Sequence, residues 1–138
     1  MSVTYIPASL RRQVYERAGG RCEYCQLAEA DAFFSHEADH IISEKRGGDT
    51  SAENLALSCF DCNRFKGSDI APTDQLTGTL VYLFNPRAQR WHDHFAVEEG
   101  LIVPLTPAGR VTEKILKLNL TERVEVRAEL ARRGLWPF

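Results

Sequence analysis

The spacing of apolar residues at the start of the chain has a helical period. Leu10, Val14 and Ala18 recur every four residues, which places them on one face of a helix. Residues 9–18 are therefore predicted to form a short helix. Ser9 is the expected N-cap, and the two glycines that follow Ala18 are expected to end the helix.

A strand, a loop, a second strand and a helix are predicted next. Residues 33–42 have the pattern of a strand, and residues 43–53 are polar and contain adjacent glycines that permit a turn with positive φ. Residues 54–58 are predicted to form a short second strand. A helix is expected to begin at residues 63–66 and to be limited by Gly67.

Strands and helices are also predicted in the second half of the chain, where the pattern changes after a turn-rich stretch. Strands are predicted at residues 79–84 and 101–105. Helices are predicted at residues 112–118, with Thr112 as a possible N-cap, and at residues 121–133. The chain as a whole is therefore expected to have an α+β fold.

Length and composition favour a single compact protein. A chain of 138 residues with 43% apolar content can bury a core. We divide it into a core at residues 1–70 and a C-terminal extension at residues 71–138, packed on that core. No apolar stretch approaches the roughly 20 residues needed to cross a bilayer. Residues 1–10 lack the order of a secretory signal, so a cytoplasmic location and no membrane partner are expected.

Charge is distributed unevenly along the chain. The formal net charge of −2 argues weakly against nucleic-acid binding. Residues 26–62 carry eight acidic and two basic side chains, whereas residues 110–138 carry seven basic and four acidic ones. Acidic side chains thus gather where divalent cations bind most readily, and basic side chains flank them. The local charges are compatible with a nucleic-acid partner.

Two CxxC pairs give the strongest chemical signal in the sequence. They are Cys22 with Cys25, and Cys59 with Cys62, separated by 33 residues. In a reducing compartment such pairs bind metal more often than they form disulfides. Thiolates are soft donors that suit zinc, and four of them form a closed structural site. Buried free cysteines or a redox pair are the alternative.

Polar residues between and beside the cysteine pairs suggest phosphodiester hydrolysis. Asp39 offers a hard oxygen ligand for Mg²⁺ or Mn²⁺, and the amide oxygen of Asn63 offers a second. His40 can accept a proton from water at neutral pH. Asn54 can hold the imidazole or brace the loop. Successive strand residues point to opposite sides, so Asp39 and His40 are not expected to share one face. Alternatively, Asp39 and His40 form a surface ion pair, and the asparagines only cap local structure.

The run ADHIISEKRGGDTSAENLALSCFDCNRFKG resembles the HNH endonuclease family, in the branch whose ββα-metal, treble-clef-like core is stapled by a four-cysteine zinc site. The resemblance implies that His40 is the general base and that Asp39 and Asn63 bind the catalytic cation. It also implies that Asn54 orients the base and stabilises the loop. Asn63 stands where many relatives have histidine, so this is an H-N-N variant, which favours Mg²⁺ or Mn²⁺ as catalytic metal.

The second half of the chain resembles the C-terminal extension of a group of uncharacterised bacterial HNH proteins, on the segments LFNPRAQRWHDHF and LTPAGRVTEKILKLN. Several cationic or imidazole side chains are candidate phosphate contacts. These are Arg64, Lys66, Arg87, Arg90 and His94. In the alternative interpretation, Trp91 and Phe95 pack on the core and the polar side chains around them are solvated.

The sequence thus predicts a metal-dependent endonuclease that hydrolyses DNA phosphodiesters, with structural Zn²⁺ and catalytic Mg²⁺ or Mn²⁺. Two alternatives stay open. One is a non-catalytic zinc module that binds nucleic acid or protein, and the other is a nuclease directed at RNA. No recognition helix is apparent, and the oligomeric state is open.

Overall fold

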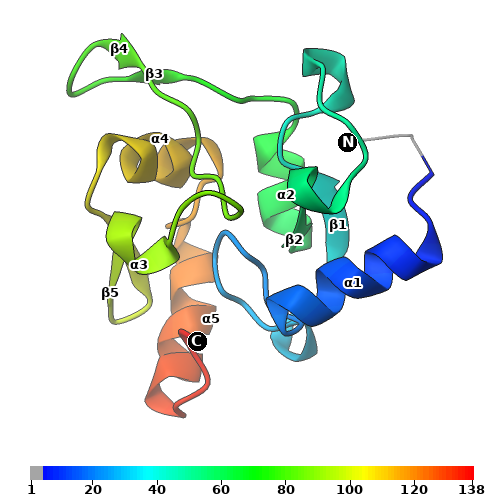
Figure 1. The fold of residues 1–138 in the computed structure, drawn as a ribbon. Coiled ribbons are helices and arrows are strands. Elements are labelled where there is room, and N and C mark those ends of the chain that lie inside the picture. The colour runs from blue at the N-terminus through cyan, green and yellow to red at the C-terminus, as the bar shows by residue number, and fades with distance from the viewer. Residues whose placement is uncertain (1–4) are drawn as a thin grey trace.

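The computed structural model describes residues 5–138, so the first four residues of the stretch considered for a secretory signal lie outside it. The described chain combines helices with small antiparallel sheets, which confirms the α+β class. Figure 1 shows the short β1–β2 pair between α1 and α2, with the remaining helices and hairpins on the other side of α2.

The first helix, α1 (Ala8–Ala18), forms where the apolar period predicts it. Val14 is fully buried at the centre of its inner face, and Gly19 ends the helix in the left-handed region at φ 64°. Ser9 is not the N-cap. The helix starts one residue earlier than predicted, and Pro7 stands at the cap position with an extended backbone and no side-chain capping bond.

Two short strands and a helix form the centre of the first half. The strand β1 (Glu37–His40) pairs antiparallel with β2 (Leu55–Ser58), with His40 opposite Leu55. The helix α2 (Phe60–Lys66) follows, and it begins three residues before its predicted start. The 3₁₀ turn η1 (Glu29–Asp31) comes before β1, which is shorter than predicted because residues 33–36 are irregular and the chain bends at residues 41–42.

The loop between the two strands is compact. It contains two 3₁₀ turns, η2 (Glu44–Arg46) and η3 (Ala52–Asn54). Gly47 has φ 93°, as the glycine pair predicts. A Cβ at Gly48 would lie 1.7 Å from the backbone oxygen of Ile42, so only glycine allows the two ends of the loop to approach this closely.

The second half has more regular structure than predicted. It contains β3 (Thr73–Asp74), β4 (Thr79–Leu80), α3 (Trp91–His94), β5 (Phe95–Glu98), β6 (Leu101–Pro104), α4 (Pro107–Ile115) and α5 (Thr121–Arg132). The strand predicted at 79–84 keeps only its first two residues. The helix predicted at 112–118 begins earlier, because Thr106 is its N-cap. Thr112 lies buried inside α4, where its hydroxyl accepts a hydrogen bond from the backbone N–H of Phe84.

One apolar cluster joins the two halves. It includes all four cysteines together with Trp91, Phe95 and Ile102 from the second half. Two indoles also donate hydrogen bonds to the first half: Trp91 Nε1 to the backbone oxygen of Tyr24 at 2.8 Å, and Trp136 Nε1 to that of Cys25 at 2.9 Å. Residues 71–138 therefore pack directly against the cysteine pairs. Within residues 5–138, no helix has the length and apolarity that crossing a bilayer requires.

Candidate functional site

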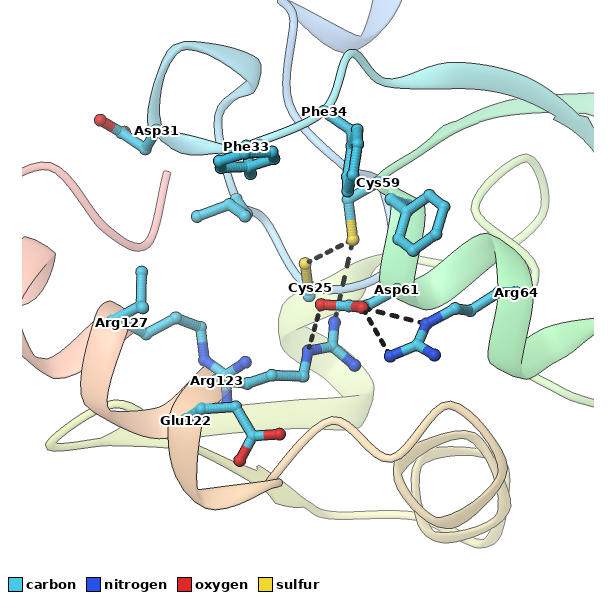
Figure 2. Close-up of a pocket in the computed structure, with 14 residues that line it drawn as sticks. Cys25, Asp31, Phe33, Phe34, Cys59, Asp61, Arg64, Glu122, Arg123 and Arg127 are labelled. Carbon is cyan, nitrogen blue, oxygen red and sulfur yellow. Dashed lines mark hydrogen bonds and ion pairs between the residues drawn. The ribbon is translucent and has the colours of Figure 1, made fainter.

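The four cysteines come together in a buried cluster. Their sulfurs all lie within 4.8 Å of one another, and none of them forms a disulfide. The Sγ atoms of Cys25 and Cys59, visible at the centre of Figure 2, are 3.7 Å apart. Four sulfurs placed tetrahedrally around zinc at about 2.3 Å are separated by about 3.8 Å, so the cluster has the dimensions of a zinc site.

In each CxxC turn a backbone N–H group is directed at the sulfur of the first cysteine. The backbone N–H of Cys25 points to Cys22 Sγ at 3.4 Å, and that of Cys62 points to Cys59 Sγ at the same distance. Cys59 is thereby the N-cap of α2. Burial raises the pKa of the Cys22 and Cys62 thiols, so thiolates here need a positive charge nearby. A divalent metal ion supplies that charge, which supports zinc as the occupant.

An arginine from the C-terminal helix adds a second positive charge beside the sulfurs. Arg123 in α5 donates to Cys62 Sγ at 3.1 Å and to the backbone oxygens of Leu116 and Lys117. Burial alone would lower the pKa of Arg123, but the thiolates of Cys62, Cys25 and Cys59 raise it overall. No sequence pattern indicated this role, because the arginine lies 61 residues from Cys62.

The candidate cation ligands lie where β1 faces α2. Glu37 and Asp39 alternate along the strand and so point to the same side, and Asn63 and Lys66 lie one turn apart on the helix. Two contacts connect them: Asn63 Nδ2 donates to Glu37 Oε2 at 3.1 Å, and Lys66 Nζ contacts Asp39 Oδ2 at 3.2 Å. Asp39 and Asn63 therefore lie diagonally opposite each other where β1 faces α2.

Asp39 is held as a buried ion pair. Its carboxylate is 6% exposed, and Lys66, which is 2% exposed, also donates to the backbone oxygen of His40 at 2.9 Å. Burial raises the pKa of Asp39, and the ammonium of Lys66 partly opposes that shift. Among the described residues no hydrogen bond uses Asp39 Oδ1 or Asn63 Oδ1. Each of these residues thus has one oxygen of the type that Mg²⁺ prefers without a hydrogen bond.

His40 points to the other side of β1, as strand alternation predicts. Its Nε2 lies 2.8 Å from Thr50 Oγ1, and the side chain is 2% exposed. The second ring nitrogen, Nδ1, is buried and has no hydrogen-bond partner among the described residues. The imidazole is therefore held in one orientation through Nε2.

Asn54 braces the loop that carries Thr50. Its Oδ1 accepts from the backbone N–H of Ile42 at 2.9 Å, and its Nδ2 donates to the backbone oxygens of Ile42 and Asp49. Arg17 of α1 closes the loop from outside by donating to Ala52 O at 2.8 Å. Asn54 makes no side-chain bond to His40, so it acts on the imidazole only through the position of Thr50.

The five predicted phosphate contacts have different surroundings. Arg64 and Arg90 are exposed, and Arg64 pairs with Asp61 at 3.1 Å. Lys66 is buried in its pair with Asp39 and is not presented to a ligand at the surface, because the strand carboxylate draws its ammonium inward. The other two have protein partners: the guanidinium of Arg87 pairs with Glu23, and His94 Nδ1 contacts Thr106 Oγ1 at 2.6 Å.

Comparison with known proteins agrees with this geometry. Residues 22–69, about a third of the chain, match the model of the family described as HNH endonuclease. Neither the curated proteins nor the solved structures contained a match to the chain. The matched segment contains both cysteine pairs and also Asp39, His40, Asn54 and Asn63. Residues 22–69 are therefore similar to the HNH endonuclease family, and the four clustered cysteines within them suit a structural zinc ion.

Proposed function

We propose that the protein is a metal-dependent endonuclease that hydrolyses DNA phosphodiester bonds, with His40 as the general base. The observation that carries the proposal is the state of the His40 ring. Thr50 holds Nε2 at 2.8 Å, and Nδ1 has no partner among residues 5–138. A histidine kept in one orientation with one free nitrogen suits proton transfer better than a structural role.

The first chemical step takes place at His40 Nδ1. This nitrogen accepts a proton from a water molecule, and the resulting hydroxide attacks phosphorus in line with the leaving 3′ oxygen. The P–O3′ bond then breaks, and a proton from solvent neutralises the leaving oxygen. Thr50 keeps Nε2 in place during this step, and Asn54 keeps the loop of Thr50 against the ends of β1 and β2.

Asp39 and Asn63 are the residues that would hold the catalytic cation. Their unpaired oxygens are hard donors, and Mg²⁺ commonly uses only one or two protein ligands and completes its shell with water and phosphate. A divalent cation there supplies charge neutralisation for the phosphate and the leaving oxygen. Lys66 keeps the carboxylate of Asp39 in position through Oδ2, which leaves Oδ1 for the metal.

RNA is the second candidate substrate for the same site. The residues gathered at β1 and α2 would grip a phosphate backbone, which DNA and RNA share, and not the edge of a base. The alternative of a zinc module that only binds requires no free imidazole nitrogen beside an acidic residue. The unpartnered Nδ1 of His40 therefore supports catalysis over simple binding.

Incubation of supercoiled plasmid with the purified protein in Mg²⁺, in Mn²⁺ and in EDTA tests the proposal. We expect metal-dependent nicking, which EDTA abolishes. The variant Asp39→Asn should lose most of the activity, because an amide is a weaker ligand than a carboxylate. Equal cleavage by Asp39→Asn and wild type would contradict the assigned cation ligands. Cleavage of a labelled RNA but not of plasmid would replace DNA by RNA as the substrate.

A further inference from the structure

Three phenylalanines near the cysteine cluster expose their rings to solvent. Phe33 is 94% exposed, Phe34 51% and Phe60 48%. The rings form a continuous row: the centroids of Phe33 and Phe34 are 5.0 Å apart, and those of Phe34 and Phe60 are 4.7 Å apart. We call these three residues the aromatic rim. Rings left in water bury no core surface, so an adjacent group of them indicates a binding surface.

The aromatic rim borders a pocket of about 430 Å³. Figure 2 shows Phe33 and Phe34 above this pocket, the sulfurs of Cys25 and Cys59 at its centre, and Arg123 below. The volume falls within the range of about 300–1,000 Å³ that is typical of small-molecule sites. A planar group stacked on the rim therefore has space to enter.

The pocket lies next to the proposed catalytic residues. Helix α2 joins the two sites, because Phe60 and Arg64 line the pocket whereas Asn63 faces β1. Phe34 also precedes Glu37, the first residue of β1, by only three positions. A nucleic-acid strand whose phosphate reached Asn63 would thus place its neighbouring bases beside the rim.

Acidic and basic side chains both line the pocket. On one side Arg64 is exposed and lies over the rings of Phe60 and Phe65, at 5.5 and 4.3 Å from their centroids. The ammonium of Lys117 also lies over Phe65, at 4.8 Å, and among the described residues it forms no ion pair. In Figure 2 the carboxylates of Asp31 and Glu122 lie on the opposite side from Arg64, together with Arg127, whereas Asp61 pairs with Arg64 at 3.1 Å. Arg64 and Lys117, both exposed, are the cations that a phosphate backbone would meet beside the rim.

We propose that the aromatic rim stacks unpaired bases of the substrate, so that the preferred substrate is single-stranded or locally unpaired nucleic acid. This inference rests on the proposed nuclease function and adds the substrate class. Stacking on exposed aromatic rings combined with backbone cations is the usual mode of single-strand binding, and it tolerates any base sequence. The carboxylates of Asp31 and Glu122 in the pocket lining offer acceptors to base amino groups.

Binding of a fluorescent single-stranded oligonucleotide and of its duplex tests the proposal, with the zinc-loaded protein in the His40→Ala background and without added Mg²⁺ or Mn²⁺, so that no cleavage occurs. Each stacked base is worth roughly a 5- to 150-fold change in affinity, so Phe33→Ala should weaken single-strand binding by that factor and leave duplex binding within twofold. Phe33→Tyr should retain binding, whereas Phe33→Leu should lose it because only the π face is removed. Because Phe33 is 94% exposed, none of these changes should affect folding.

The matched control is Tyr82→Ala, which removes an aromatic side chain that is 72% exposed and does not line the pocket. It should bind the single strand like the parent protein. Equal single-strand affinity of the Phe33→Ala variant and the control would overturn the proposal. It would also be overturned if Phe33→Ala abolished self-association in sedimentation without changing oligonucleotide affinity, since the rim would then be a protein interface. Because binding is measured without cleavage, a failure of the nuclease assignment would appear separately, in the plasmid assay.

Discussion

Removal of the Arg123 side chain is expected to weaken the zinc site and the fold together. The guanidinium donates to Cys62 Sγ at 3.1 Å, to Leu116 O at 2.8 Å and to Lys117 O at 3.1 Å, and the residue is only 8% exposed. Arg123→Met keeps most of the volume but leaves thiolate charge and two carbonyl oxygens without this donor. Loss of one partner of a buried charged pair costs about 3–5 kcal/mol.

Two measurements separate the parts of this effect. Urea unfolding of the zinc-loaded protein should give a midpoint lowered by about 1 M or more, since m-values of small proteins are about 1–3 kcal/mol/M. Competition with a chromophoric chelator should show zinc affinity reduced by about 10- to 100-fold, the usual effect of losing a group that supports a metal ligand. Arg123→Lys should fall between wild type and Arg123→Met.

Arg132→Met is the matched control on the same helix. The side chain of Arg132 is 68% exposed and pairs with Glu129, so its loss should change the free energy of unfolding by no more than about 0.5 kcal/mol. If Arg123→Met were as stable and bound zinc as tightly as Arg132→Met, the reasoning that Arg123 stabilises the thiolates would be refuted.

Two further predictions concern the loop and the β3 hairpin. Thr50→Val should slow plasmid nicking roughly two- to tenfold through loss of one hydrogen bond to His40, and Thr50→Ser should not; equal rates for both variants would remove Thr50 from the mechanism. A hydrogen bond from Arg110 lowers the pKa of Asp74 to about 2. This pair therefore stabilises the fold above the unfolded carboxyl pKa, near 4, and the gain is lost as pH falls towards 2. Urea unfolding measured at several pH values tests this prediction. Between pH 5 and pH 2 the free energy of unfolding should fall less for Asp74→Asn than for the wild type.

The sequence was most informative where chemistry depends on local spacing. The two CxxC motifs predicted the four-cysteine cluster, because four consecutive residues are enough to bring the two sulfurs of each motif together. The long helix α5 (Thr121–Arg132) also follows from its own pattern. The start of α4 was missed although its signal is local: Thr106 and Pro107 are a capping residue followed by proline at the first helical position.

Contacts between distant segments could not be predicted from the sequence. The pair of Lys66 with Asp39 joins residues 27 positions apart, and nothing in either residue's neighbourhood selects the other. Thr50 reaches His40 only because the loop folds back, with Gly48 against Ile42. The roles of these side chains depend on tertiary packing, which residue patterns specify only indirectly.

The central claim is that His40 is the general base, and single-turnover cleavage of a labelled DNA strand tests it most directly. His36 is a suitable control because it is also buried near β1, but its Nε2 contacts the backbone oxygen of Leu27 at 2.8 Å and not Thr50. With zinc content and folding verified, His40→Ala should cleave about 10²- to 10⁴-fold more slowly, whereas His36→Ala should stay within tenfold of wild type. Cleavage by His40→Ala at the wild-type rate would contradict the account.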